Sequence, residues 1–185
     1  MPRLFTALEL PEPLRLHLSL IRAPINGAKW VEADNMHITL RFAGDIDERT
    51  ADDFADRLHD IRAEPLPITV AGVGAFAGRE ARVLWAGVDG GVALEELYRA
   101  NERAARAVGL EADPRPFKPH VTLARARGVR PRAAARFLQE NGALRLMPFV
   151  ASRFVLLSAR PGSGGPPYAL EEAYPLAPAL SLGAG

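Results

Sequence analysis

Apolar and polar residues alternate along several segments of the chain, in the pattern of strands with one buried face. This alternation predicts strands over residues 3–8, 36–42, 68–76, 82–88, 117–125, 149–159 and 168–174. Apolar residues at helical spacing predict helices over residues 11–22, 47–63, 92–108 and 132–140. Turns are expected at Gly78 and in the glycine-rich segment 162–167. Strands and helices therefore mix throughout the chain, and the fold class is predicted as α+β.

The order of these elements repeats after about 80 residues. Strand, helix and strand in the first half of the chain correspond to strand 82–88, helix 92–108 and strand 117–125. The last strand of each set carries the same tetrad, HITL at 37–40 and HVTL at 120–123. We predict that residues 1–185 form a single bilobal domain of two duplicated lobes, with the two tetrad histidines facing each other across one cleft.

The tetrad is a short pattern, and a third near match, His17-Leu18-Ser19-Leu20, shows how loose it is. That match lies in the predicted helix 11–22, where residues two apart point to different sides. On a strand, residues two apart share a face, so parity places His37, Thr39 and Arg41 together. A lone strand histidine is commonly structural, but two equivalent His-x-Thr units favour a functional site. Arg125 is five residues beyond His120 and needs a bulge or a strand end to join that site.

The composition of the chain excludes several kinds of functional site. Of the 185 residues 48% are apolar and 24% charged, and there is no cysteine, which excludes disulfides, thiolate metal sites and a cysteine nucleophile. No His-Glu-x-x-His motif and no phosphate-binding glycine loop is present, so we expect neither a metal nor a cofactor. No apolar run is long enough to cross a membrane, and we expect a cytoplasmic protein without membrane contact.

Charge is concentrated around the second tetrad. The net charge is only +1, yet residues 114–136 contain seven Lys and Arg and no Asp or Glu. A basic stretch of this kind is typical of a site that receives phosphate groups, with solvated surface as the alternative.

Metal-free cleavage of a phosphodiester needs a base, an acid and donors for the nonbridging oxygens. Two histidines meet the first two needs, because histidine changes its charge near neutral pH. The hydroxyls of Thr39 and Thr122 can donate to phosphoryl oxygens, and Arg41 and Arg125 would add charged donors. The two tetrads are alike, so the residues alone do not assign acid and base.

Longer segments around the tetrads resemble the two-histidine phosphoesterase superfamily. NMHITLRFAGDI is similar to its first motif, RPFKPHVTLAR to its second, and RLFTALELPEP to its opening strand and helix. Within the superfamily the chain is most similar to the RNA 2′,3′-cyclic phosphodiesterases, historically called 2′-5′ RNA ligases. The resemblance and the repeat together predict a bilobal duplicated fold, in which two antiparallel-rich sheets face a central cleft and helices lie outside.

The resemblance implies a hydrolase that opens an RNA 2′,3′-cyclic phosphate to a 2′-phosphate without metal or cofactor. It implies His37 as proton donor to the leaving 3′ oxygen and His120 as the acceptor that activates water. Thr39, Thr122 and Arg125 would hold the phosphate, and Phe117 or Tyr168 is a candidate for stacking on the terminal base, with core packing as the alternative.

Two other functions stay open at this point. One is 2′-5′ ligation of RNA halves, which would use the same histidines in reverse. The other is a non-catalytic RNA-binding protein with structural histidines. In each case the expected partner is RNA, with cyclic-phosphate-ended tRNA fragments as one candidate substrate of the hydrolase, and the expected oligomeric state is a monomer.

Overall fold

The computed structural model describes residues 3–77, 81–160 and 167–178, and in this part of the chain nine strands form an antiparallel sheet. The strands are β1 (Arg3–Glu9), β2 (Ala28–Trp30), β3 (His37–Asp45), β4 (Leu66–Ala77), β5 (Ala81–Asp89), β6 (His120–Val129), β7 (Phe149–Ala151), β8 (Arg153–Ala159) and β9 (Tyr168–Pro175). The helices are α1 (Glu12–Leu20), the 3₁₀ helix η1 (Ala33–Asn35), α2 (Glu48–His59), α3 (Gly91–Ala107) and α4 (Pro131–Asn141). The predicted α+β class is confirmed.

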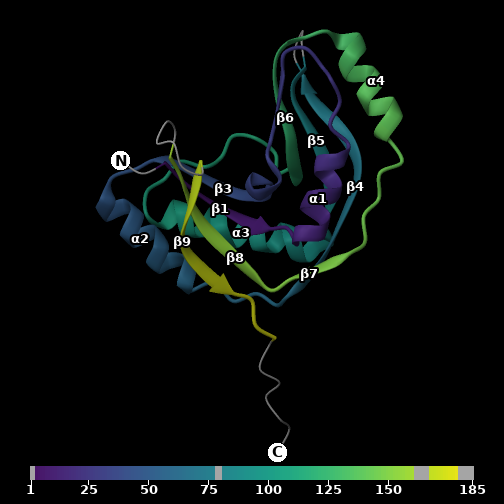
Figure 1. Ribbon diagram of the computed structural model, residues 1–185. Coiled ribbons are helices and arrows are strands. Elements are labelled where there is room, and N and C mark those ends of the chain that lie inside the picture. Colours follow the sequence, from purple (N-terminus) through teal and green to yellow (C-terminus); the bar gives the residue numbers. More distant parts are fainter. Residues whose placement is uncertain (1–2, 78–80, 161–166, 179–185) are drawn as a thin grey trace, which may run out of the picture.

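The strand order is symmetrical about the two strands that carry the tetrads. It runs β7-β4-β5-β6-β3-β1-β8-β9, with the short β2 also paired to β6. β3 and β6 are paired through Ile38 and Val121 alone, and the two halves of the sheet run in different directions from that junction (Figure 1). The expected pair of sheets is therefore joined into one curled sheet at the tetrads. This order supports the division of residues 1–185 into two duplicated lobes, which stays a prediction.

The four predicted helices are present, with ends within four residues of the predicted ones. The side chain of Asp47 accepts the Thr50 N–H at 2.9 Å and so begins α2, which buries Phe54 and Leu58 one turn apart. Because α1 is a helix, the near match that begins at His17 is not on a strand, as predicted.

Some strands differ from the prediction. The predicted strand 149–159 is divided at Ser152 into β7, which pairs with β4, and β8, which pairs with β1 and β9. β6 begins at His120, so Phe117 precedes it. β2 and η1 have three residues each, too few for a periodic pattern to reveal. The turn predicted at Gly78 and most of the loop predicted over 162–167 lie outside the described residues.

The helices α3 and α4 pack against strands of the sheet. α3 packs on β3 and buries Leu94, Leu97 and Ala105, while α4 packs on β4 and β5. The apolar side chains between the helices and the sheet form the main core. None of the helices in the described residues is long and apolar enough to cross a membrane.

Candidate active site

Both tetrad strands contain a bulge at the same position. In the pairing of β1 with β3, Ala7 is opposite Thr39 and Thr6 is opposite Arg41, so Leu40 is an extra residue. In the pairing of β5 with β6, Trp85 is opposite Thr122 and Leu84 is opposite Ala124, so Leu123 is the extra residue. An extra residue in one strand of a pair re-aims the side chains that follow it. In both strands the fourth and fifth residues of the motif are buried, and the sixth is exposed.

The predicted position of Arg41 beside His37 is wrong, because the bulge in β3 turns this side chain away. Its side chain points to the helix-covered face and is only 6% exposed, and its guanidinium forms an ion pair with Glu102 of α3. It also donates to the carbonyl oxygens of Phe42 and Glu111. Parity along a regular strand placed this residue beside His37, and the extra residue reverses that parity. Arg41 is therefore not among the residues that line the site.

The bulge in β6 has the opposite effect on Arg125. The position of Arg125 in its motif is that of Phe42 in the first, and both side chains lie on the histidine face. The condition that a bulge must turn Arg125 inward is thus met. Because the same bulge occurs in both strands, the ring of Phe42 lies on one side of the site and the guanidinium of Arg125 lies on the other.

These side chains line a pocket of about 330 Å³ at the junction of the two half-sheets. His37, Thr39, Thr122 and Arg125 line it together with Tyr168. The register at the junction, Ile38 opposite Val121, places His37 across from Thr122 and Thr39 across from His120. The other lining residues are Arg3, Phe5, Val31, Asn35, Phe42 and Ala159.

The two histidines have the same hydrogen bond. Nδ1 of His37 donates to the carbonyl oxygen of Asn35 at 2.8 Å, and Nδ1 of His120 donates to the carbonyl oxygen of Lys118 at 2.7 Å. A carbonyl oxygen only accepts, so Nδ1 carries the hydrogen in both rings. Nε2 of each ring is left to accept a proton when the ring is neutral or to donate one when it is charged.

The surroundings hold both rings toward the neutral form. Burial is the largest cause of a lowered pKa of His37, and the positive charges of Arg125 and His120 lower it further against the effect of the Asn35 hydrogen bond. Burial also lowers the pKa of His120, assisted by the charges of Lys118, Arg115 and Arg125. A bound anion would oppose these effects and favour the charged form of each ring.

Aromatic rings support each histidine. The ring centroid of His37 lies 5.0 Å from that of Phe5 and 5.1 Å from that of Tyr168. The ring of His120 lies 4.9 Å from Phe76 and 6.1 Å from Trp85. These contacts restrict how far each imidazole can turn, so Nε2 keeps its direction.

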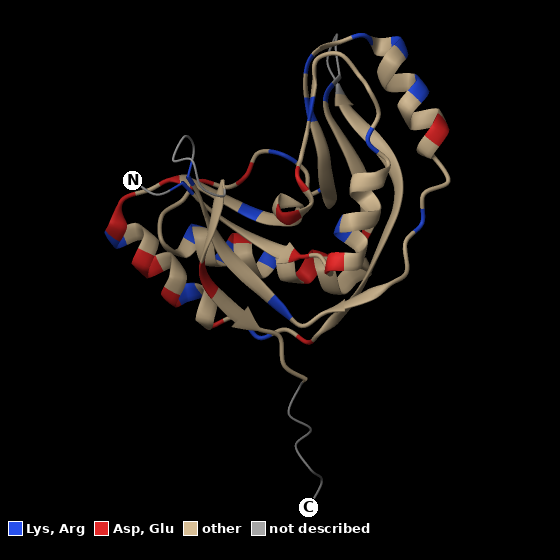
Figure 2. Ribbon diagram, in the orientation of Figure 1, with Lys and Arg blue, Asp and Glu red and all other residues tan. Residues whose placement is uncertain are grey.

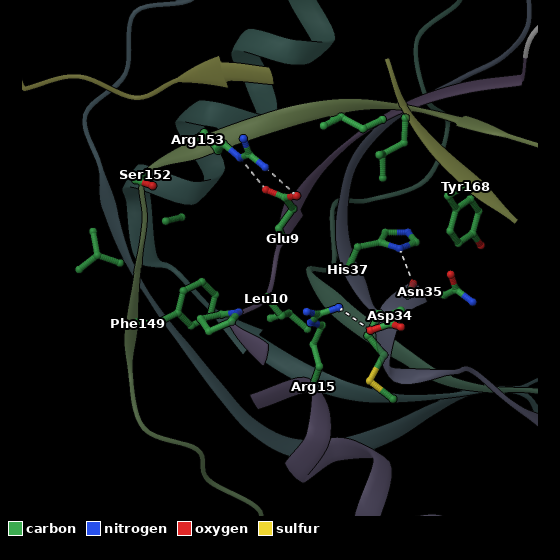
Figure 3. A pocket seen from close by; sticks show the side chains of 16 residues that line it. Glu9, Leu10, Arg15, Asp34, Asn35, His37, Phe149, Ser152, Arg153 and Tyr168 are labelled. Atoms are coloured by element: carbon green, nitrogen blue, oxygen red, sulfur yellow. Dashed lines mark hydrogen bonds and ion pairs between the residues drawn. The ribbon is translucent and has the colours of Figure 1, made fainter. Parts of the chain in front are cut away.

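A larger cavity of about 540 Å³ adjoins the pocket and shares His37, Asn35 and Tyr168 with it (Figure 3). Its charged groups are paired: the guanidinium of Arg153 holds the Glu9 carboxylate with two hydrogen bonds of 2.7 and 3.0 Å, and Arg15 contacts Asp34 at 3.2 Å. Apolar side chains such as Leu10, Met36 and Phe149 complete the wall. The cavity therefore suits a neutral polar group better than a second anion.

Phe117 lies away from both cavities. Its ring stacks on Tyr98 of α3 at 4.1 Å between centroids, which favours the packing role that was the alternative to base stacking. The pocket residues not predicted are Arg3, Phe5, Val31, Asn35, Phe42 and Ala159. Alignment of the two motifs would have indicated Phe42, because it occupies the position of Arg125. Among the described residues no group of three or more His, Asp or Glu is arranged to hold a metal ion.

Comparisons with known proteins agree with this arrangement. A family model described as LigT like phosphoesterase matches residues 8–85 and 89–168. The RNA 2′,3′-cyclic phosphodiesterase of Aeropyrum pernix is 41% identical over 117 residues, which cover 62% of this chain and 66% of that protein. The protein of the same name from Methanothermobacter thermautotrophicus is 34% identical over 137 residues, covering 70% of this chain and 74% of its own.

Solved structures share the fold. The crystal structure of Escherichia coli LigT complexed with 3′-AMP has a TM-score of 0.77 to this chain at 24% sequence identity. The alignment covers 95% of this chain and 99% of that one. The whole curled sheet with its helices is therefore common to the two proteins.

Proposed function

The chain belongs to the LigT-like phosphoesterase family, and from that membership we propose that it hydrolyses RNA 2′,3′-cyclic phosphate ends to 2′-phosphates. We further propose that the reaction needs no metal and that His37 and His120 are its acid and base. The observation that carries the mechanism is the duplicated hydrogen bond from Nδ1 to a backbone carbonyl, which leaves Nε2 free on both rings. His37 lines the pocket, and His120, which is not among the lining residues, lies across the strand junction from Thr39.

In the proposed step a water molecule attacks the phosphorus atom of the cyclic phosphate. Nε2 of neutral His120 takes a proton from that water, and the bond between phosphorus and the 3′ oxygen breaks. Nε2–H of charged His37 donates its proton to the departing 3′ oxygen, so the product carries a 3′-hydroxyl and a 2′-phosphate. The two histidines have then exchanged protonation states, and solvent restores them.

The other polar groups of the pocket would bind the phosphate oxygens. The hydroxyls of Thr39 and Thr122 lie on opposite strands and can each donate to a nonbridging oxygen. Arg125 adds a charged donor, whose attraction grows as negative charge builds up on the phosphoryl group. Three donors from two strands would thus hold the phosphorus between the two Nε2 atoms.

The assignment of roles follows the resemblance to the family, and the surroundings of each ring are consistent with it. Three cations, Lys118, Arg115 and Arg125, lower the pKa of His120 in addition to burial, so this histidine is suited to start the reaction neutral. His37 lines both the pocket and the larger cavity, and the terminal nucleoside could occupy the neutral, partly apolar space of that cavity beside Tyr168. The negative charge of the substrate would raise the pKa of His37 and keep its proton until the 3′ oxygen leaves.

The test uses an RNA oligonucleotide ending in 2′,3′-cyclic phosphate, with EDTA present. We expect conversion to a product heavier by one water whose phosphate is removed by phosphatase, with the 3′-hydroxyl free. His37→Ala and His120→Ala should each lower kcat by about 10²- to 10⁴-fold, the usual contribution of a general acid or base. His17→Ala is the matched control, because His17 begins the third near match but lies on α1.

Two results would contradict the proposal. Full activity in both histidine variants would remove the acid–base mechanism. Dependence on an added divalent ion, with none in EDTA, would remove the metal-free reaction. The use of tRNA fragments as substrate and the monomeric state stay predictions.

A further inference from the structure

The seven cations of the basic stretch 114–136 do not form one uniform surface. Arg115 is paired with Asp113 at 3.3 Å and Arg136 with Glu140 at 2.7 Å. The ammonium of Lys118 lies over the Trp85 ring, 5.0 Å from its centroid. These three side chains are already engaged, so the stretch offers fewer free cations than its sequence suggests.

Two of the remaining four cations, Arg125 and Arg127, lie where β2 pairs with β6, while Arg130 and Arg132 lie at the start of α4. Lys29 of β2 is directly opposite Arg125, and Arg127 follows two residues later on β6. All three are exposed, and none has an ion pair with any residue in the part of the chain that the structure describes. Like charges directly opposite in a sheet are destabilising. Their presence without a carboxylate points to a ligand that supplies the negative charge.

The three cations lie on the face that carries the site. β2 and β6 pair without a bulge from Ala124 to Ala126, and Arg125 and Arg127 are exposed on either side of the buried Ala126. Arg127 therefore points to the same side as Arg125, which lines the pocket. Lys29 shares that side as the cross-strand partner of Arg125, and Val31, two residues after Lys29, also lines the pocket. Lys29, Arg125 and Arg127 therefore form a cationic strip that leads out of the pocket.

The backbone beneath the strip is fixed by a close approach. The Arg127 N–H donates to the carbonyl oxygen of Gly27 at 2.8 Å, and Gly27 has a φ of +87°. A Cβ atom on Gly27 would lie 2.2 Å from the carbonyl oxygen of Arg127. The turn before β2 thus holds the strip in place. Figure 2 shows further Lys and Arg toward the end of β6 and on α4, while Asp and Glu gather on α2.

We propose that the cationic strip binds the backbone phosphates of the RNA strand that leads to the reacting end, with Lys29 and Arg127 as the residues that select a polynucleotide over a mononucleotide. This inference rests on the proposed function. Arg125 would hold the reacting phosphate, and its neighbours in the strip would hold preceding ones. Successive positions on this face are about 7 Å apart along the strand, close to the spacing of neighbouring phosphates in an extended nucleic acid. A cyclic mononucleotide has no such phosphates and gains nothing from the strip.

The experiment compares an RNA octanucleotide ending in 2′,3′-cyclic phosphate with a 2′,3′-cyclic mononucleotide. In Lys29→Ala/Arg127→Ala we expect KM for the octanucleotide to rise by about tenfold at 50 mM salt, because two counterion-releasing contacts are lost. Turnover of the cyclic mononucleotide should not change. The matched control is Arg103→Ala/Arg106→Ala, which removes the same charge from exposed positions of α3, on the opposite face of the sheet.

The salt dependence of octanucleotide binding provides a second test of the strip. Each phosphate contact on a single strand contributes about 0.7 to the slope of log affinity against log salt, so two contacts give about 1.4. Between 50 and 200 mM salt, octanucleotide binding by the wild type and the control should therefore weaken about sevenfold more than binding by Lys29→Ala/Arg127→Ala. Fluorescence anisotropy with an octanucleotide that already ends in 2′-phosphate measures this without turnover.

The outcomes separate the two proposals. If the strip variant and the α3 control bind the octanucleotide alike, the strip does not bind RNA, whatever the catalytic result. If the wild type turns over neither substrate but the strip variant still loses binding, the proposed function fails and the strip remains an RNA-binding surface. If both variants lost octanucleotide affinity equally, the loss would be a general effect of net charge, and the proposal that the strip binds RNA would be wrong.

Discussion

The ion pair between Arg41 and Glu102 gives a direct test of how the bulge in β3 directs side chains. Arg41→Met leaves the carboxylate of Glu102 without its partner, and the two side chains are 6% and 18% exposed. Loss of one partner from a buried pair costs about 3–5 kcal/mol of unfolding free energy. For a chain of this length that corresponds to a fall in Tm of about 6–20 °C.

The double variant Arg41→Met/Glu102→Met removes both charges. Replacing a buried pair by apolar side chains of similar size is often close to neutral. The carbonyl oxygens of Phe42 and Glu111 still lose their donor, at about 0.5–1.5 kcal/mol each. We therefore expect the double variant to be less stable than the wild type by about 1–3 kcal/mol, and more stable than Arg41→Met.

Urea unfolding followed by circular dichroism measures these free energies, and kcat/KM below the transition measures function. We expect kcat/KM of folded Arg41→Met to stay within about fivefold of the wild type, because Arg41 lines neither the pocket nor the larger cavity. A stable Arg41→Met protein that had lost activity a hundredfold would refute the reasoning, since Arg41 would then face the pocket as simple strand parity suggests. Should Arg41→Met not fold, Arg41→Lys gives the same comparison with the charge retained.

Three further outcomes are expected. Arg125→Met should lower kcat/KM by about 10²- to 10³-fold with little change in Tm, and its pH profile should move to higher pH, because the guanidinium lowers the pKa of both histidines. In the wild type the pKa values of both histidines are below the ordinary 6.5, so kcat/KM should already fall as the pH rises above 6.5. The fall in kcat should occur at higher pH, because bound phosphate favours the charged ring. If kcat and kcat/KM fell over the same pH range above 6.5, this prediction would be contradicted. Gly27→Ala should lower the free energy of unfolding by about 2–4 kcal/mol, because the new Cβ atom would clash with the carbonyl oxygen of Arg127. Gly128 has a φ of +66° and open space around it, so Gly128→Ala should lower the free energy of unfolding by only about 1 kcal/mol. Thermal unfolding of both variants measures the difference.

The sequence predicts the helices and most strands of this fold because each buries one regular face. Phe54 and Leu58 of α2 are one turn apart, and the tetrad strands alternate until the bulge. β2 has only three residues and is defined by its pairing with β6, so no pattern within it could reveal it. Likewise, the division of the predicted strand 149–159 depends on which strands its two parts pair with.

The wrong prediction for Arg41 has a different cause, and the sequence contained information that could have prevented it. Aligned with the second motif, Arg41 corresponds to Ala124, and Phe42 corresponds to Arg125. Alanine after Leu123 suits a buried position, and an arginine five residues beyond His120 can reach the site only if parity changes. The same change in the first strand turns Arg41 away. Comparing the two copies therefore predicts the bulge, whereas either copy read alone does not.

The duplicated bulge also suggests how two nearly identical tetrads would serve the proposed asymmetric reaction. His37 and His120 have equivalent backbone hydrogen bonds, so the tetrads alone provide two interchangeable Nε2 atoms. Beyond the bulge the copies differ: the first places Phe42 on the histidine face and buries its arginine against Glu102, and the second places Arg125 there. One side of the pocket is thus aromatic and opens to a neutral cavity, and the other is cationic and continues into the strip. A cyclic phosphate with a nucleoside on one side and a polyanionic strand attached can bind such a site in one orientation, and that orientation would decide which histidine donates the proton.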